Sequence, residues 1–454
     1  MRPLVVVDVV GLTPRLLEHM PNVAKLGAPA ELRTVLPAVT CSVQSTLLTG
    51  AMPRDHGIVG NGWYFRDVGE VLLWRQHNAL VEGPKIWDDA RKVKPGYRVA
   101  NICWWYAMGA ATEFTVTPRP IYHADGRKSP DCYTTPPSLR NDLTRELGRF
   151  PLFSYWGPTA GITSSQWIVD AARLMLARER PDLTLVYVPH LDYDLQRYGS
   201  SGPEAVAAAR EVDRVLGPLL DDAAAAGAVT VVLSEYGITD VSRPVDVNRV
   251  LRSEGLLSVY RQAGMEYLDP WVSRAFAVAD HQLAHVYVRD PADVPRVRSL
   301  IGSLPGVDQV LDAEGKAAHG LDHARAGELV AVAAPDSWFT YYYWLDDDLA
   351  PDFARSVEIH RKPGYDPAEL FMNPADPLVK AKAALALARK ELGFRYTMPV
   401  IPLDPSMVKG SHGRLPADPL DGPVLLSSET LDRQSYAATD VKSLLLRLGG
   451  LQQM

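Results

Sequence analysis

The chain has 454 residues, of which 47% are hydrophobic and 22% are charged, which is the composition of a globular protein with a sizeable core. It carries 54 acidic residues and 47 Lys or Arg residues, and its formal charge of −7 argues against binding a nucleic-acid polymer. The three cysteines (Cys41, Cys103 and Cys132) form no CxxC pair, which is typical of a reducing compartment and argues against a cysteine-bound metal.

The first residues predict a buried strand rather than a targeting segment. The apolar run Leu4–Val7 is too short for the hydrophobic part of a signal peptide before Asp8 interrupts it. No stretch reaches about 18 uninterrupted apolar residues, so we expect no membrane span. We therefore expect a cytoplasmic protein.

Short runs rich in β-branched residues alternate with longer segments of helical period, which is typical of parallel strands joined by crossover helices. The segment Gly202–Ala226 has Pro203 near its start and Gly227 just past its end, as expected for a capped helix. The sequence therefore predicts an α/β fold, a three-layer sandwich with a central, mostly parallel sheet. The clearest strands are Leu4–Val7, Tyr97–Cys103, Leu183–Val188 and Val229–Leu233.

Two segments differ from this pattern. Residues from about 105 to 160 are rich in Pro, Tyr and Thr, and we interpret them as a cap or lid inserted into a single domain that spans residues 1–454. The segment Trp338–Pro374 is also rich in aromatic residues and proline. Its aromatic side chains either pack in a core or form a wall that faces a substrate, and the sequence leaves both interpretations open.

Three acidic residues follow predicted strands at their carboxyl ends, where the functional groups of a doubly wound sheet gather. Asp8 follows Leu4–Val7, Asp192 follows Leu183–Val188, and Glu235 follows Val229–Leu233. Each of them alone fits an ordinary cap or turn. Together they would place like charges in one crevice, which is tolerable mainly if cations neutralise them.

Two further motifs contain polar groups suited to phosphoryl chemistry. The segment Pro37–Gly50 leads from a predicted strand into a short helix, and a hydroxyl at a helix N-terminus is well placed to attack phosphorus. His412, between Ser411 and Gly413, offers a neutral imidazole as a ligand for zinc or a similar metal. Both patterns are also common in ordinary caps and solvated loops.

Taken in order, these residues resemble the alkaline phosphatase superfamily and, within it, the nucleotide pyrophosphatase/phosphodiesterase branch. The resemblance runs from Val7-Asp8 through Pro37–Gly50 and Pro53–Asn61 to the loops of Asp192, Glu235 and His412. It implies the three-layer fold and two divalent metal ions, commonly zinc, that flank a Thr or Ser nucleophile. It also implies a phosphodiester or pyrophosphate substrate.

Spacing within this superfamily favours Thr40 over Cys41 as the nucleophile. Sulfatases of the superfamily place their modified Cys or Ser ten positions before the Gly of a Thr-Gly pair, and Thr40 lies ten positions before Gly50. Sulfatases also have Pro and Arg two and four positions after the nucleophile, where this chain has Ser42 and Gln44. The resemblance therefore implies a phospho-threonine intermediate on Thr40.

By the family pattern, one metal would be bound by Asp8, Thr40, Glu235 and Tyr236, and the other by Asp192, Gln196 and His412. Several of these positions depart from the pattern: Gln196 and Tyr236 replace histidines, Glu235 replaces an aspartate, and Val43 replaces an asparagine. Amide and phenol groups are poorer zinc ligands than imidazole.

Three explanations of these departures stay open. The site binds metal through harder, oxygen-rich ligands, which shifts its preference toward manganese, magnesium or iron. Alternatively, His190 or His281 supplies the missing imidazole. In the third explanation the chain has lost hydrolysis and is a ligand-binding or scaffold protein that keeps the fold.

The sequence thus predicts a metal-dependent hydrolase of a small phosphodiester or pyrophosphate, with Thr40 as nucleophile. Asn61 and Trp63 are the substrate-binding candidates, and Tyr64 and Trp105 are further candidates for a wall around a nucleoside or lipid-like leaving group. The sequence defines neither the leaving group nor the oligomeric state.

Overall fold

The computed structural model describes residues 1–124, 127–392 and 397–451, and it contains a nine-stranded central sheet. Strands β11, β1, β10, β5 and β6 run parallel, whereas β22 and β9 are antiparallel to their neighbours β11 and β6. This confirms the predicted α/β fold with a mostly parallel sheet. In spatial order the strands are β23 (Ser435–Ala437), β2 (Ala30–Arg33), β22 (Val424–Ser427), β11 (Val229–Leu233), β1 (Leu4–Val9), β10 (Leu183–Val188), β5 (Val99–Ile102), β6 (Phe114–Pro118) and β9 (Cys132–Thr135).

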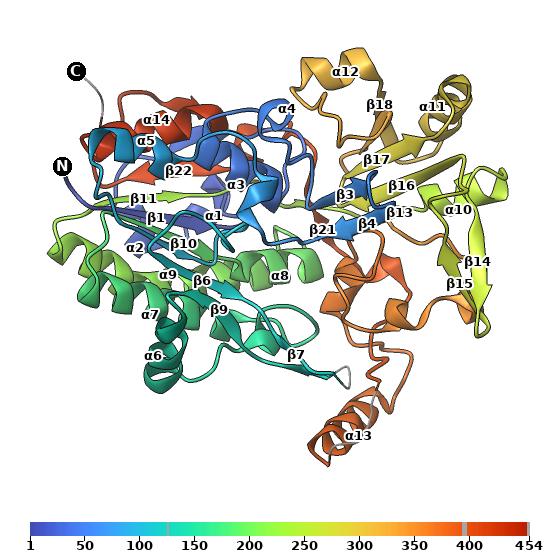
Figure 1. Ribbon diagram of the computed structural model, residues 1–454, viewed down its shortest axis with the longest axis horizontal. Coiled ribbons are helices and arrows are strands. Elements are labelled where there is room, and N and C mark those ends of the chain that lie inside the picture. Colours follow the sequence, from blue (N-terminus) through green and yellow to red (C-terminus); the bar gives the residue numbers. More distant parts are fainter. Residues whose placement is uncertain (125–126, 393–396, 452–454) are drawn as a thin grey trace.

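Helices cover both faces of this sheet and make it the middle of three layers (Figure 1). The helices on one face are α6 (Pro137–Leu147), α7 (Ile162–Arg178), α8 (His190–Tyr198) and α9 (Pro203–Ala225). On the other face lie α3 (Thr40–Thr49), α4 (Pro53–His56), α5 (Ile86–Val93) and α14 (Val441–Leu448). Strands β1, β10 and β11 are buried along their whole length, which explains their largely apolar sequences.

The predicted central elements agree closely with the structure. Strands β10 and β11 have the predicted bounds, and α9 between them begins at Pro203 and ends at Ala225. The first predicted strand extends to Val9, and the one predicted over Tyr97–Cys103 is shortened to Val99–Ile102. These small differences leave the carboxyl ends of β1, β10 and β11 side by side.

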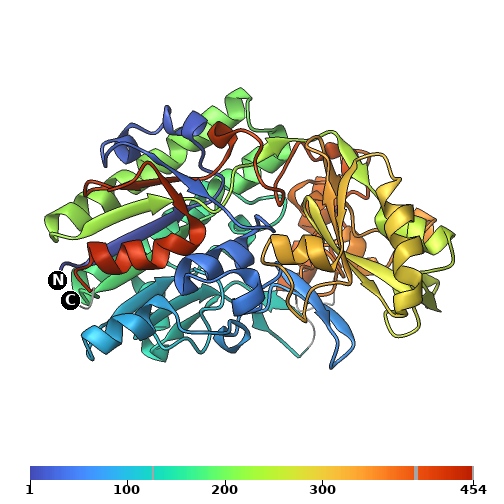
Figure 2. The ribbon, with the colours of Figure 1, turned by 90° about the horizontal axis from the view of Figure 1, so that it is seen from above.

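A second, four-stranded antiparallel sheet packs beside the first, and the sequence analysis did not anticipate it (Figure 2). It has its own buried apolar core, to which Phe339, Tyr341 and Trp344 contribute. The first part of the aromatic segment Trp338–Pro374 is therefore core packing. The strands are β16 (Ala275–Asp280), β17 (Leu283–Val288), β19 (Leu329–Ala333) and β18 (Val307–Leu311), and the helices around them are α10 (Val247–Ser253), α11 (Val294–Gly302) and α12 (Ala313–Ala318).

The segment 105–160 contributes both to the central sheet and to the surface beside it. It supplies β6 and β9 at the sheet edge, helix α6, and the hairpin of β7 (Ile121–Tyr122) and β8 (Lys128–Ser129). Residues 125 and 126 of this segment lie outside the described residues. Its role as a lid stays a prediction.

The small ladder of β12 (Thr239–Asp240) and β21 (Gly410–Ser411) positions the functional loops. Its antiparallel pairing holds the chain around Gly410 beside the loop that follows β11. The remaining short pairs are β3 (Gly62–Phe65) with β4 (Glu70–Leu73), β13 (Arg243–Val245) with β20 (Ser337–Phe339), and β14 (Val259–Gln262) with β15 (Met265–Leu268). None of the helices in the described ranges is long and apolar enough to cross a membrane.

Gly237, directly after Glu235 and Tyr236, is held where a side chain does not fit. A Cβ atom there would lie 1.8 Å from the Asp421 carbonyl oxygen and 2.8 Å from a Thr13 methyl carbon. Because a backbone carbonyl must then move, we expect Gly237→Ala to lower the free energy of unfolding by about 3 kcal/mol. Gly96→Ala is the matched control, since nothing lies within 4 Å of its Cβ position. Equal melting temperatures of the two variants by calorimetry would contradict this.

Candidate active site

Three buried carboxyl groups meet at the carboxyl edge of the central sheet. Asp8 lies near the end of β1 in register with Leu233 of β11, Glu235 follows β11, and Asp192 lies in the first turn of α8 after β10. Burial raises the pKa of Asp8 and of Asp192 to about 7. Burial and the adjacent charge of Asp8 raise the pKa of Glu235 well above its usual range.

The hydroxyl of Thr40 lies between these groups because Thr40 is the first residue of α3, after the extended residue Val39. Its Oγ1 shares a hydrogen bond of 3.1 Å with the phenol oxygen of Tyr236. One turn along the same helix, the Gln44 amide nitrogen donates to Asp8 at 3.1 Å. The helix therefore presents both its N-terminal hydroxyl and an amide to the carboxyl edge of the sheet.

A second polar group surrounds Asp192. The Gln196 amide nitrogen donates to Asp192 Oδ2 at 2.8 Å, and the phenol of Tyr365 donates to Gln196 Oε1 at 2.8 Å. The ring nitrogen Nε2 of His412 lies 3.7 Å from Asp192 Oδ1. His412 Nδ1 donates to the Ala38 carbonyl at 2.8 Å, so Nε2 carries the lone pair when the ring is neutral. Burial lowers the pKa of His412 to about 3, which keeps the ring neutral.

Four aromatic rings form a continuous stack along this site. Tyr236 lies on His412 with ring centres 3.6 Å apart, and His412 lies on His281 at the same distance. His281 in turn stacks on Tyr365, again at 3.6 Å. His281 occupies the turn between β16 and β17 with a backbone φ of +61°, a strained conformation for a residue other than glycine. The second sheet thus contributes one ring to the site.

Asn61 lies directly beside the nucleophile position and is held from both sides. Its Oδ1 accepts a hydrogen bond of 3.0 Å from the backbone nitrogen of Cys41, the residue after Thr40. Its backbone nitrogen and Nδ2 donate to the two oxygens of Asp280 at 2.7 and 3.0 Å. Asp280 therefore fixes which side of the amide faces the loop of Thr40.

Several acceptor atoms of this group are buried without a partner. Asp8 Oδ1, both oxygens of Glu235, Asp192 Oδ1 and His412 Nε2 are buried without a hydrogen-bond partner. Within the described ranges, no Lys or Arg forms an ion pair with Asp8, Asp192 or Glu235. Unpaired buried acceptors of this kind are costly unless a cation or a proton satisfies them. Each half of the site offers two conventional ligands, and among the described residues no group of three or more His, Cys, Asp or Glu is placed to hold one metal ion.

Other sequence-predicted residues lie outside this group. His190, the first residue of α8, places Nε2 3.1 Å from Glu211 on α9 and does not join the stack. Trp63 is buried against Phe65 with the guanidinium of Arg325 5.1 Å above its ring, and it does not line the cavity. Sequence reasoning missed the roles of Gln44, Asp280 and Tyr365. Gln44 was detectable as a polar residue inside the predicted nucleophile helix.

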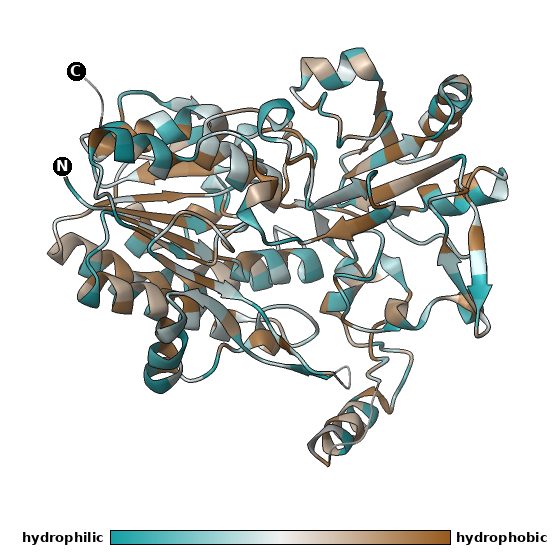
Figure 3. Ribbon diagram, in the orientation of Figure 1, coloured by the Kyte–Doolittle hydropathy of each residue, from teal (hydrophilic) through white to brown (hydrophobic). Residues whose placement is uncertain are grey.

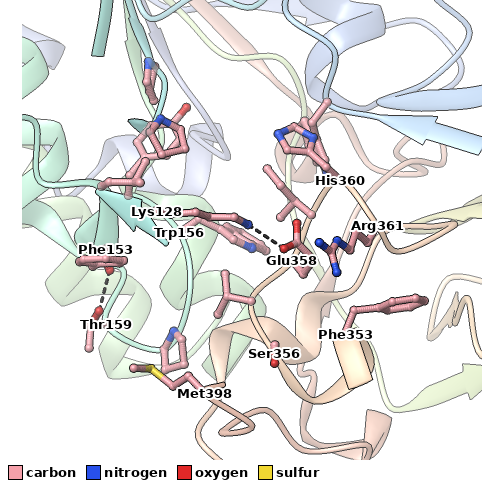
Figure 4. A pocket seen from close by; sticks show the side chains of 18 of the residues that line it. Lys128, Phe153, Trp156, Thr159, Phe353, Ser356, Glu358, His360, Arg361 and Met398 are labelled. Carbon is pink, nitrogen blue, oxygen red and sulfur yellow. Dashed lines mark hydrogen bonds and ion pairs between the residues drawn. The ribbon is translucent and has the colours of Figure 1, made fainter. Parts of the chain in front are cut away.

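A large cavity of about 1350 Å³ opens above this group. Thr40, Tyr236 and His281 form part of its floor, and Trp105, which the sequence predicted, lies on its wall. The outer part of the cavity is formed by the segment 105–160 and by residues 352–361 (Figure 4). Residues 352–361 belong to the second part of the aromatic segment Trp338–Pro374. Across it, Lys128 donates to Glu358 at 2.7 Å. Other aromatic lining residues are Trp74, Tyr122, Phe153, Tyr155, Trp156, Tyr187, Tyr193, Phe353 and Tyr365.

A sequence model of the type I phosphodiesterase/nucleotide pyrophosphatase family matches residues 4–366. The chain belongs to this family. The match spans β1, the Thr40 helix, the Asp192 and Glu235 loops and Tyr365. An uncharacterised pyrophosphatase/phosphodiesterase of Schizosaccharomyces pombe is 25% identical over 189 residues, which are 41% of this chain and 32% of the relative. The alignment thus spans about one third of the curated relative's length.

Solved structures of two other proteins share the fold. The phosphonoacetate hydrolase of Sinorhizobium meliloti, solved with phosphonoformate, has a TM-score of 0.61 and 16% identity, over 99% of this chain and 96% of that chain. Murine ectonucleotide pyrophosphatase/phosphodiesterase 5, solved as an inactive variant with AMP, has a TM-score of 0.58 and 15% identity, over 100% and 96%. Both confirm the three-layer architecture.

The unpaired carboxyl groups predict a stabilising effect of divalent cations. At pH 8, Mn²⁺ at one hundred times its dissociation constant is expected to stabilise the folded chain by about 2.7 kcal/mol, because it binds only the folded state. Glu235→Gln, which removes one buried charge, should melt higher than the parent chain in chelator and respond less to Mn²⁺. Differential scanning calorimetry with and without Mn²⁺ measures both effects. A melting temperature of the parent chain that ignores Mn²⁺, Mg²⁺ and Zn²⁺ would contradict the cation site.

Proposed function

We propose that the chain hydrolyses a phosphodiester or pyrophosphate bond in a small molecule, with Thr40 as the nucleophile. One observation carries the proposal: the Thr40 hydroxyl is on the cavity floor at a helix N-terminus, bonded to Tyr236 and flanked by carboxyl groups without counter-charge. A hydroxyl so placed can attack phosphorus while the helix N-terminus stabilises the phosphoryl oxygens.

Two divalent cations are part of this proposal. Asp8, Thr40, Glu235 and Tyr236 would hold the first, and Asp192, His412 and Gln196 would hold the second, with His281 adjacent to His412 as the alternative imidazole. Bound cations supply Lewis-acid activation of the hydroxyl and of the phosphoryl oxygens. The first set offers only oxygen atoms, which favours manganese or magnesium, whereas the family resemblance favours zinc and the second set includes one imidazole.

Three side chains of the site have roles in the proposed reaction besides holding cations. Tyr236 orients the Thr40 hydroxyl, and the adjacent carboxylate of Glu235 takes up its proton as the Thr40 oxygen bonds to phosphorus. The bond from phosphorus to the leaving-group oxygen breaks in the same step, and the leaving group departs into the cavity. The free N–H of the Asn61 amide donates to a phosphoryl oxygen, since only one of its two hydrogens is used by Asp280. Water then hydrolyses the phospho-threonine and restores Thr40.

The cavity supports a leaving group with a substantial apolar part. Trp74, Trp105 and Trp156 stand along its walls, and Trp74 and Trp105 contact each other with ring centres 5.0 Å apart. Residues of the segment 105–160 on the opposite wall support the lid role predicted for it. The three cysteines are all unpaired and buried, which supports a cytoplasmic location.

A second candidate function is a ligand-binding protein without hydrolysis. The observation that favours it is that amide nitrogens of Gln44 and Gln196 donate to Asp8 and Asp192, so that neutral donors partly replace cations. Tyr236 likewise gives the Thr40 hydroxyl a neutral hydrogen-bond partner in place of a cation. Metal analysis of protein purified without chelator separates the two functions, because an empty site in folded protein favours the second.

Thr40→Ala is expected to lower kcat for a p-nitrophenyl phosphodiester by at least about a thousandfold, because alanine has no hydroxyl that could attack phosphorus. The metal content should stay unchanged, since the carboxyl and imidazole ligands remain. Thr40→Ser is the matched control and should retain measurable turnover with the same metal content. Full activity of the alanine variant would refute the nucleophile assignment.

Asp280 is expected to act on turnover only through Asn61. Asp280→Asn leaves one hydrogen bond to Asn61 unmade, and we expect kcat/KM to fall roughly tenfold or more because the amide is no longer oriented. In an Asn61→Ala background the same change should cost less than about twofold, which a double-mutant cycle measures. Asp213→Asn, a buried acid bonded to Asn22 instead, controls for general destabilisation. Additive losses would contradict the role of Asp280.

A further inference from the structure

The surface around the cavity mouth is unusually apolar. Eight of the sixteen large apolar side chains that are strongly exposed in the described part of the chain lie on or beside it. Four of them line the mouth itself, namely Tyr122, Phe153, Val357 and Leu387. The other four are Ile121 in β7 and, in and beside helix α13 (Val379–Glu391), Leu378, Leu385 and Leu392.

Helix α13 stands out from the body next to the mouth and has apolar residues on two sides (Figures 1 and 3). One side is buried through Val379 and Ala386, and the buried side packs on Val400 and Ile401. Leu378, Leu385 and Leu392 are 60%, 63% and 74% exposed. Their spacing of seven residues places them on one face of the helix. When one face of a helix packs on the protein and another face carries exposed leucines, the exposed face is expected to contact another apolar surface.

Basic residues accompany these apolar side chains. Arg127, Lys128, Arg355, Arg361 and Arg389 line the cavity, and the only acidic residues among its described lining outside the catalytic group are Asp352 and Glu358. Arg361 is exposed beside His360 at the mouth (Figure 4). In sequence, residues 379–391 contain four Lys or Arg and one acid, in a chain whose net charge is −7.

We propose that this face docks on an anionic lipid surface, with α13 and the β7–β8 hairpin in contact with the lipid and the cavity opening toward it. Leucine and aromatic side chains next to Lys and Arg are the residues that insert at the boundary between headgroups and acyl chains. Charge decides between occupants. A second copy of the chain would bring the basic mouth against itself, whereas an anionic surface is complementary to it.

The proposal concerns binding and does not depend on hydrolysis. It gives the cavity a route by which an amphiphilic ligand enters without crossing water. Lys128 and Glu358, which are paired across the mouth, are the charged groups that an entering headgroup meets first.

Sedimentation of the full chain with lipid vesicles tests the docking. We expect co-sedimentation with phosphatidylcholine vesicles containing about one third phosphatidylserine, and weaker binding to phosphatidylcholine alone, since each contacting Lys or Arg contributes roughly fivefold. Leu385→Asp combined with Leu392→Asp should weaken binding at least roughly tenfold. Both sites are exposed, so the variant should fold normally. Leu420→Asp, 48% exposed elsewhere on the chain, is the matched control and should bind like the parent.

Three outcomes would overturn the proposal. The parent chain fails to sediment with either vesicle, or the double variant binds as tightly as the parent. In the third, light scattering shows a dimer that the double variant dissociates while vesicles bind neither protein, which would assign the face to a second copy. Thr40→Ala should bind vesicles like the parent, so failure of the proposed catalysis leaves this test intact.

Discussion

Three carboxyl groups buried at one edge of a sheet, with no Lys or Arg of the described residues paired with them, are the constraint on which this structure depends. Asp8, Asp192 and Glu235 are held there by backbone elements and not by ion pairs. Burial raises the pKa of each, because a charge without a partner is poorly solvated in the interior. The carboxyl groups at the cavity floor therefore lack neutralising positive charge, and either cations or protons must supply it.

The central sheet can impose this arrangement because its middle strands are covered on both faces. Strands β1, β10 and β11 are buried along their length, so their register is set by burial and their carboxyl ends are aligned whatever the following loops contain. The pairing of β12 with β21 then places His412, from a distant part of the chain, beside these strand ends. Close backbone packing at Gly237 completes the loop of Glu235 and Tyr236.

Much of this arrangement is predictable from sequence, for a physical reason. A strand buried on both faces leaves a largely apolar run, and an acidic residue at or just after its end is then conspicuous, as for Asp8 and Glu235. Thr40 and His412 became conspicuous through the order of motifs along the chain. Asp280 and Tyr365 did not, because nothing local distinguishes them: each acts through a contact with Asn61 or Gln196, more than 160 positions away. The second sheet was missed because its short antiparallel strands resemble parallel ones in sequence.

The substituted ligand positions change the character of the site without removing its charge. Gln196 stands where the family pattern expects an imidazole. Its amide nitrogen donates a hydrogen bond to Asp192, and its amide oxygen accepts one from Tyr365. The amide therefore holds the Asp192 carboxylate in position. Tyrosine at 236 braces Thr40 and also continues the ring stack through His412 and His281 to Tyr365. Each replacement exchanges a strong nitrogen donor for a group that positions its neighbour. In the proposed cation site this exchange would lower the affinity for a soft metal while the geometry of the carboxylates and the hydroxyl is kept, and it would favour harder, oxygen-preferring cations.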